Sequence, residues 1–139
     1  MTKSRLLIFL MALAALASCD KVYINGDLDG MWQLQRVETG DTTEYPQGIY
    51  YSFQRHMVQV GEYYENRLPE RYIGNLDYKG GTLTISGLRK YLEVEKPCPA
   101  TKLNAFYLFS DSVTFTIEKL NKEILVMKNG EKRYLFEKW

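Results

Sequence analysis

The segment VTFTIEKLNKEILVMKNGEKRYLFEKW, residues 113–139, decides the fold class of this chain. Its first part, 113–118, alternates apolar and polar residues, which is typical of a half-buried β-strand. A reversal at 120–123 leads to a second apolar run, 124–127, and Asn129-Gly130 then precedes a third run, 133–139. Asn-Gly favours a hairpin because a type I′ turn requires positive φ at both central residues. The segment therefore predicts three consecutive antiparallel strands.

The rest of the chain continues this pattern. Short runs rich in β-branched and aromatic residues are cut by turn signals about every eight to twelve residues, as in all-β sandwiches and barrels. The expected strands cover 31–38, 49–53, 57–60, 71–78, 82–86 and a short stretch at 92–94. Because nearly all connections are short, we predict an all-β domain that forms an antiparallel up-and-down barrel of about eight or nine strands, or a strongly curved sandwich. Closure into a barrel would remove the exposed sheet edges.

One segment departs from the strand pattern. Residues 101–109 lack a period of two, and Leu103, Phe106 and Tyr107 fit helical spacing better. Pro99 and Thr101 are residue types that begin helices. We expect one or two helical turns here that cover an end of the barrel, although an irregular strand would fit the same residues.

The first nineteen residues indicate where the protein resides. Lys3 and Arg5 precede twelve uncharged, mostly apolar residues at 6–17, the layout of a secretory signal peptide. The run is shorter than the roughly 20 residues of a membrane-spanning helix. Leu16-Ala17-Ser18-Cys19 resembles the lipobox of bacterial lipoproteins, in which the cysteine is acylated. A retained transmembrane helix and a signal peptide without lipidation are the alternatives.

This resemblance implies a domain organisation and a location. We expect a lipoprotein signal peptide at 1–18, lipidation of Cys19, a lipidated tether at 19–28 and a barrel domain at 29–139. The protein would then be attached to a membrane of the cell envelope through its lipid. Inner membrane, outer membrane and cell surface all remain open.

Composition argues against nucleic acid as a partner. The chain has 18 basic and 17 acidic residues, and removal of Lys3 and Arg5 with the signal peptide leaves 16 basic residues against 17 acidic ones. A formal charge of −1 gives no basic excess with which to neutralise phosphates.

The sequence contains no pattern that supports catalysis or metal binding. His56 is the only histidine, it falls in an expected turn, and no Gly-x-Ser-x-Gly nucleophile motif accompanies it. Once Cys19 carries lipid, Cys98 is the only other thiol, and a structural zinc site needs four ligands. Glu62, Glu65 and Glu70 fit a solvated loop better than a pair of glycosidase carboxylates. We therefore predict a non-enzymatic protein with no catalytic residues, metal or cofactor.

The start of the first strand resembles a known family. Gly30-Met31-Trp32 resembles the Gly-x-Trp signature of lipocalins, in which the tryptophan closes one end of the barrel. Lipobox, short tether, Gly-x-Trp strand and closing run together are similar to lipocalin-like domains of Gram-negative lipoproteins. The Thr-Asp-Tyr motif of typical lipocalins is absent, and Arg133 and Lys138 are the candidates for the basic residue that stacks on the tryptophan. The alternative is an ordinary core tryptophan in a sandwich.

The inward faces of the expected strands suggest a binding function. Tyr51, Tyr72 and Tyr78 share these faces with apolar residues that include Phe53 and Phe115. Eight strands enclose an interior that is either filled or holds one small ligand. Since a buried tyrosine hydroxyl needs a partner, three of them predict a pocket for a small apolar ligand with a few polar groups. Equally, these hydroxyls could reach water at the rim.

A second hypothesis places function on the loops. Tyr63, Tyr64 and Arg67 are residue types that are common at interaction hot spots. The domain would then be a filled barrel that serves as an interaction or assembly module and contacts another envelope protein. The size of the barrel interior discriminates between the two hypotheses.

Overall fold

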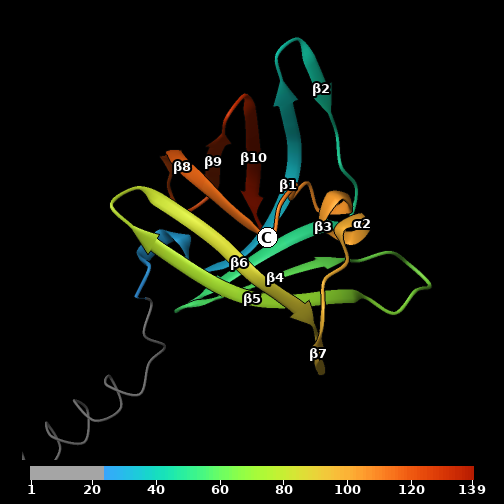
Figure 1. Ribbon diagram of the computed structural model, residues 1–139. Coiled ribbons are helices and arrows are strands. Elements are labelled where there is room, and N and C mark those ends of the chain that lie inside the picture. The colour runs from blue at the N-terminus through green and yellow to red at the C-terminus, as the bar shows by residue number, and fades with distance from the viewer. Residues whose placement is uncertain (1–23) are drawn as a thin grey trace, which may run out of the picture.

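The main β-sheet closes on itself to form a barrel (Figure 1). The structure, a computed structural model, describes residues 24–139, so the expected signal peptide and Cys19 lie outside the described residues. The strands are β1 (Gly30–Thr39), β2 (Thr42–Glu44), β3 (Ile49–Gln54), β4 (Met57–Glu62), β5 (Glu70–Lys79), β6 (Thr82–Lys90), β7 (Glu93–Pro97), β8 (Ser112–Leu120), β9 (Ile124–Asn129) and β10 (Lys132–Lys138). The helices are the 3-10 turn η1 (Gly26–Leu28) and α2 (Ala100–Ala105).

Eight of these strands make the barrel, in the order β10-β9-β8-β6-β5-β4-β3-β1. Closure comes from β1 and β10, which pair antiparallel with Leu34 opposite Phe136 and Val37 opposite Tyr134. The short strands β2 and β7 are additions that pair with β1 and β6, respectively. The predicted all-β antiparallel barrel is therefore confirmed, including the terminal meander and the closing strand pair.

Alternation of side chains along the strands builds the core inside the barrel. In β3, for example, Ile49, Tyr51 and Phe53 are buried, whereas the residues between them are partly exposed. Cross-strand pairs such as Leu83 opposite Phe115 bring apolar residues of neighbouring strands together on the inner face.

One end of the barrel, which we call the closed end, is sealed by η1 and Trp32. The Trp32 indole Nε1 donates a hydrogen bond of 2.8 Å to the Leu28 carbonyl. Leu28, the last residue of the expected tether, is itself fully buried. Lys138 Nζ lies 4.4 Å from the Trp32 ring centre and donates to the carbonyls of Asp27 and Asp29.

Gly30 is required by this arrangement. Its φ is +123°, and a Cβ at this position would lie 2.8 Å from the Lys138 side chain. Of the two basic candidates for stacking on the tryptophan, Lys138 takes that place. Gly30, Trp32 and Lys138 therefore lie together at the closed end.

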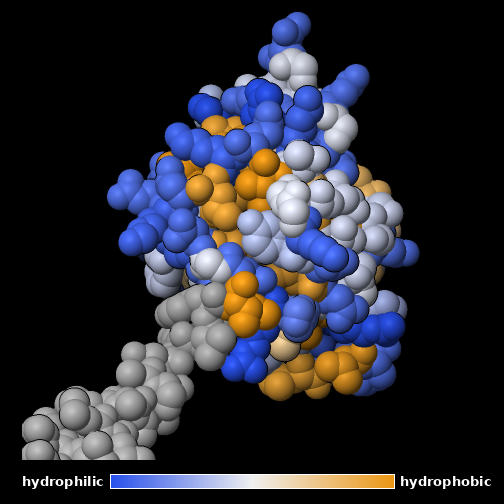
Figure 2. Space-filling view, turned by 90° about the vertical axis from the view of Figure 1, so that its left-hand side faces the viewer, coloured by the Kyte–Doolittle hydropathy of each residue, from blue (hydrophilic) through white to orange (hydrophobic). Residues whose placement is uncertain are grey.

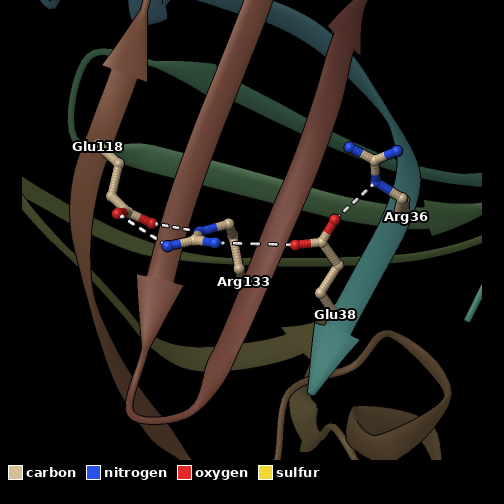
Figure 3. A network of polar contacts seen from close by, with 4 residues as sticks. All are labelled: Arg36, Glu38, Glu118 and Arg133. Carbon is tan, nitrogen blue, oxygen red and sulfur yellow. Dashed lines mark hydrogen bonds and ion pairs between the residues drawn. The ribbon is translucent and has the colours of Figure 1, made fainter. Parts of the chain in front are cut away.

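Arg133 instead belongs to a charged network on the outer wall where the barrel closes (Figure 3). It pairs with Glu118 of β8 at 2.7 Å and with Glu38 of β1 at 3.8 Å, and Glu38 pairs with Arg36 at 3.0 Å. These side chains are partly exposed, and such pairs each contribute about 0–1 kcal/mol to stability. The network therefore aligns β1, β10 and β8 more than it stabilises them.

Candidate binding site

The candidate pocket residues occupy the barrel interior, with one exception. Tyr51, Phe53 and Phe115 are at most 1% exposed, and Tyr72 is 6% exposed. Tyr78 faces the same way but lies one residue before the end of β5, opposite Leu83, where it is only partly buried. The structure therefore does not bring Tyr78 together with Tyr51 and Tyr72.

The interior around the other four residues is filled by side chains. The ring centres of Tyr51 and Phe136 lie 5.0 Å apart, and those of Phe115 and Tyr134 lie 5.1 Å apart. Phe106, which follows α2, is fully buried, and its ring centre lies 5.7 Å from that of Tyr72. Contacts of this kind are typical of a packed aromatic core.

The segment that contains Phe106 closes the second end of the barrel, and we call residues 98–108 the plug. Figure 1 shows α2 beside β3 at this end. The helix confirms the expected helical turns near 101–109, and its apolar side is set by Leu103, which is buried with Phe106 and Leu108. Lys102 of α2 forms an ion pair with Glu70, the first residue of β5.

Two buried tyrosine hydroxyls hold the plug from inside the barrel. The hydroxyl of Tyr51 donates to the Phe106 carbonyl, and that of Tyr134 donates to the Tyr107 carbonyl at 2.6 Å. Burial raises the pKa of Tyr134 to about 12 and raises the pKa of Tyr51 well above its ordinary value. Both phenols therefore remain protonated donors.

Four hollows with volumes of 240–400 Å³ lie on the surface of the described part of the chain. None of these four is lined by Tyr51, Phe53 or Phe115. Tyr72 contributes to one, a hollow of about 310 Å³ that also involves Leu68 and Leu92. The hollows therefore lie around the barrel rather than in it.

The loops around the plugged end, which we call the mouth, carry exposed apolar side chains. Leu68, in the connection between β4 and β5, is 92% exposed, and Leu92, between β6 and β7, is 82% exposed. A second hollow of about 270 Å³ adjoins the first through Leu68 and adds Tyr64 and Arg67. Figure 2 shows hydrophobic atoms gathered at the lowest part of the molecule, at the height where Figure 1 places the end of β7.

The residues considered for catalysis or metal binding gather only in part: Glu62 and Glu70 lie opposite each other on β4 and β5, and Glu65 lies in the connection between these strands. His56 is exposed in the turn between β3 and β4. Cys98 is buried in the plug, and burial raises the pKa of its thiol to about 11, so it is a neutral thiol at physiological pH. Within residues 24–139, no three histidine, cysteine or acidic side chains are placed to hold a metal ion.

Comparison with known proteins identifies the family. Residues 13–139 match a family described as a lipocalin-like domain. This chain belongs to the lipocalin-like domain family. No curated protein matches this lipocalin-like chain.

Two solved structures share the fold of this lipocalin-like domain. A lipocalin-like protein from Bacteroides uniformis is 22% identical with a TM-score of 0.65, and the match covers 82% of this chain and 100% of that one. An uncharacterised protein from Bacteroides eggerthii is 18% identical with a TM-score of 0.66, and the match covers 81% of this chain and 99% of that one.

In the part of the chain that the structure describes, no helix is long and apolar enough to cross a membrane.

Three residues that shape the site of this lipocalin-like domain, namely Tyr134, Phe136 and Phe106, were not assigned to it from the sequence. In β10, Tyr134, Phe136 and Lys138 are each two residues apart. Because side chains of a strand alternate between its two faces, this spacing could have placed all three on the inner face. Phe106 had only its helical spacing with Leu103 as a signal. That spacing predicts a helix face but not insertion of the face into a barrel.

Proposed function

We propose that this chain is a non-enzymatic, lipocalin-like lipoprotein of the cell envelope, anchored through Cys19, that binds a protein partner at its mouth. The observation that carries the proposal is the filled interior: Phe106 occupies the space between the barrel walls, and the hydroxyls of Tyr51 and Tyr134 are satisfied by the plug. The barrel then acts as a rigid scaffold that displays loops.

The mouth offers a specific feature for a partner to recognise. Leu68 and Leu92 come from different loops and line one hollow, together with the aliphatic and aromatic parts of Arg71 and Tyr91. The Arg71 guanidinium lies 4.1 Å from the Tyr91 ring centre, which fixes one wall of the hollow. Two leucines exposed by more than four-fifths at one hollow favour insertion of an apolar side chain from a partner, as at hot spots.

Site-specific photo-crosslinking in the native host tests this proposal. A photoreactive amino acid at position 68 should give one discrete protein adduct, and the additional change Leu92→Ser should abolish it. The matched control places the same amino acid at Lys79, which is exposed near the opposite, closed end. If positions 68 and 79 give the same adducts, or if Leu92→Ser leaves the adduct intact, the mouth is not the docking site.

A second candidate function is binding of a small apolar ligand inside the barrel. It is favoured by one observation: both buried hydroxyls, those of Tyr51 and Tyr134, bind carbonyls of the same short plug. Displacement of residues 106–108 would free two polar groups on an otherwise apolar wall, which is the chemistry of a ligand pocket.

Native mass spectrometry of protein purified from its own host tests this second candidate. A small molecule that co-purifies and is lost in Tyr51→Phe, but retained in Tyr78→Phe, would overturn the filled-scaffold proposal. Mass equal to that of the lipidated protein alone, in every preparation, would exclude a resident ligand.

A further inference from the structure

The described chain begins at the closed end, and hydrogen bonds fix its entry point there. Asn25 Nδ2 donates bonds of 2.8 Å to Asp29 Oδ1 and to the Arg55 carbonyl, and the Asn25 backbone N–H donates to Asp29 Oδ2 at 3.2 Å. Arg55 lies in the turn between β3 and β4. Figure 1 shows η1, in blue, on one side of the barrel and α2 on the other. Ile24 therefore lies at the end of the barrel opposite the mouth.

Only a short stretch of chain joins this entry point to the expected lipid. Cys19 and Ile24 are five residues apart, and five residues span at most about 18 Å even when fully extended. The barrel is longer than that, because the ten-residue strand β5, at about 3.3 Å per residue and tilted by roughly 40°, covers about 25 Å of its axis. If Cys19 carries lipid, the mouth cannot face the bilayer, since the chain could not reach along the whole barrel.

The closed end also carries exposed apolar side chains close to the entry point. Ile24 is 48% exposed, and Met57, the first residue of β4, is 51% exposed. Met57 pairs with Gln54 of β3 and Asn75 of β5, which are also exposed and carry no charge. Apolar side chains held beside a membrane favour the boundary between headgroups and acyl chains.

The charges at this end are balanced in sign. The connections expose Arg55 and Lys122 against Asp27 and Glu123, and the end of β5 adds Lys79 against Asp77. Equal numbers of basic and acidic side chains give no excess with which to attract an anionic lipid. The short chain that leads to the lipid, rather than charge, is therefore what would bring this end to a bilayer.

We propose that the closed end rests on the surface of the lipid bilayer that holds the anchor, with Ile24 and Met57 in the headgroup layer. This inference rests on the proposed lipidation of Cys19 and goes beyond it, because it fixes which way the domain faces. The mouth then points into the aqueous compartment, where a protein partner can reach Leu68 and Leu92.

Fluorescence quenching in reconstituted vesicles measures this orientation. The lipidated full chain is reconstituted into phosphatidylcholine vesicles in which part of the lipid carries a nitroxide quencher on its headgroup. A thiol-reactive fluorophore is attached at Met57→Cys, and Leu68→Cys at the mouth is the matched control, since both side chains are exposed and apolar. Cys98 is only 7% exposed, so protein without an introduced cysteine gives the labelling blank. Quenching should be several-fold stronger at position 57 than at position 68.

Two further substitutions test the contact with lipid itself. With the fluorophore at Lys79→Cys, which is also at the closed end, the additional change Met57→Asp should reduce the quenching, because a carboxylate opposes burial among the lipids. The control is Tyr45→Asp, which alters a 67% exposed tyrosine beyond β2, away from the closed end, and should leave the quenching unchanged.

The outcomes separate this inference from the proposals on which it rests. Equal quenching at positions 57 and 68, absence of quenching at position 57 in attached protein, or no effect of Met57→Asp would overturn the inference and leave the anchor and the mouth standing. Protein that carries no lipid and does not attach to the vesicles would overturn the anchor, and this inference with it.

Discussion

Substitution of Phe106 by alanine tests whether the plug fills the barrel. Phe106 is fully buried, its ring packs edge-on against Tyr72, and its carbonyl accepts the hydrogen bond of Tyr51. Replacement by alanine keeps the carbonyl and removes the ring, so the change isolates the packing of one side chain inside the barrel.

Removal of a fully buried phenylalanine ring costs about 3–5 kcal/mol, which combines lost burial with the cavity left behind. Domains of this size unfold with a free energy of about 5–15 kcal/mol, so the loss is a large share of the total. The midpoint of thermal unfolding should fall by roughly 10–20 °C. Because other buried side chains of the plug, such as Leu103 and Leu108, remain, we expect the variant to fold at low temperature.

Urea unfolding followed by far-ultraviolet circular dichroism provides the measurement. The control is Phe109→Ala, three residues away, where the ring is 52% exposed and only Lys132 is placed over it. That change should cost no more than about 1 kcal/mol. A loss below about 1 kcal/mol for Phe106→Ala would show that Phe106 does not pack in the barrel, and the filled-scaffold proposal would lose its basis.

Three further predictions concern the closed end, the titration of buried groups and the anchor. Lys138→Met should lower the free energy of unfolding in urea by about 1–3 kcal/mol, since it removes the cation over Trp32 and two hydrogen bonds to carbonyls. The control Arg133→Met should cost about 1 kcal/mol or less. Equal losses in the two variants would contradict the stacking role of Lys138. Burial raises the pKa of Cys98 from 9.0 to about 11 and that of Tyr134 from 10.0 to about 12. The stability that these two groups contribute is therefore complete below pH 9 and is lost as the pH rises to 12. Denaturant titrations across this pH range should show the decline, and a flat profile would refute it. Cys19→Ala should release the protein from the membrane fraction, and a variant that stays membrane-bound and unprocessed would contradict lipidation.

The sequence predicted the strands because burial in a barrel imposes a period of two. In β8 the alternation of Val113 and Phe115 with polar residues fixed both the strand and its inner face. A glycine inside a strand pattern indicates a bulge, and the pairing of β5 with β6 shifts register at Gly74, between Ile73 and Asn75. These features are local, and local patterns are what a sequence displays directly.

The same alternation could not place residues along the barrel axis. Tyr72 and Tyr78 share a face of β5, yet Tyr72 packs under the plug and Tyr78 lies near the closed end. Nor could it show that Phe106 inserts between the walls, because that contact joins residues distant in sequence. The pattern therefore identified which side chains face inward, while the structure determined whether they line a space or fill it.

The filled interior also sets an energetic condition on any ligand that would enter the barrel. Such a ligand must replace the burial of Phe106, about 3–5 kcal/mol, and offer acceptors to the hydroxyls of Tyr51 and Tyr134, which otherwise cost about 1–3 kcal/mol each when unpaired. A drug-sized molecule contributes about 0.3 kcal/mol per heavy atom, or roughly 6 kcal/mol for twenty atoms. Against a displacement cost of similar size, little affinity is left unless the ligand carries acceptors where the plug carbonyls now lie. A partner at the mouth meets no such cost, because Leu68 and Leu92 are already exposed, and this difference favours docking at the mouth over binding within the barrel.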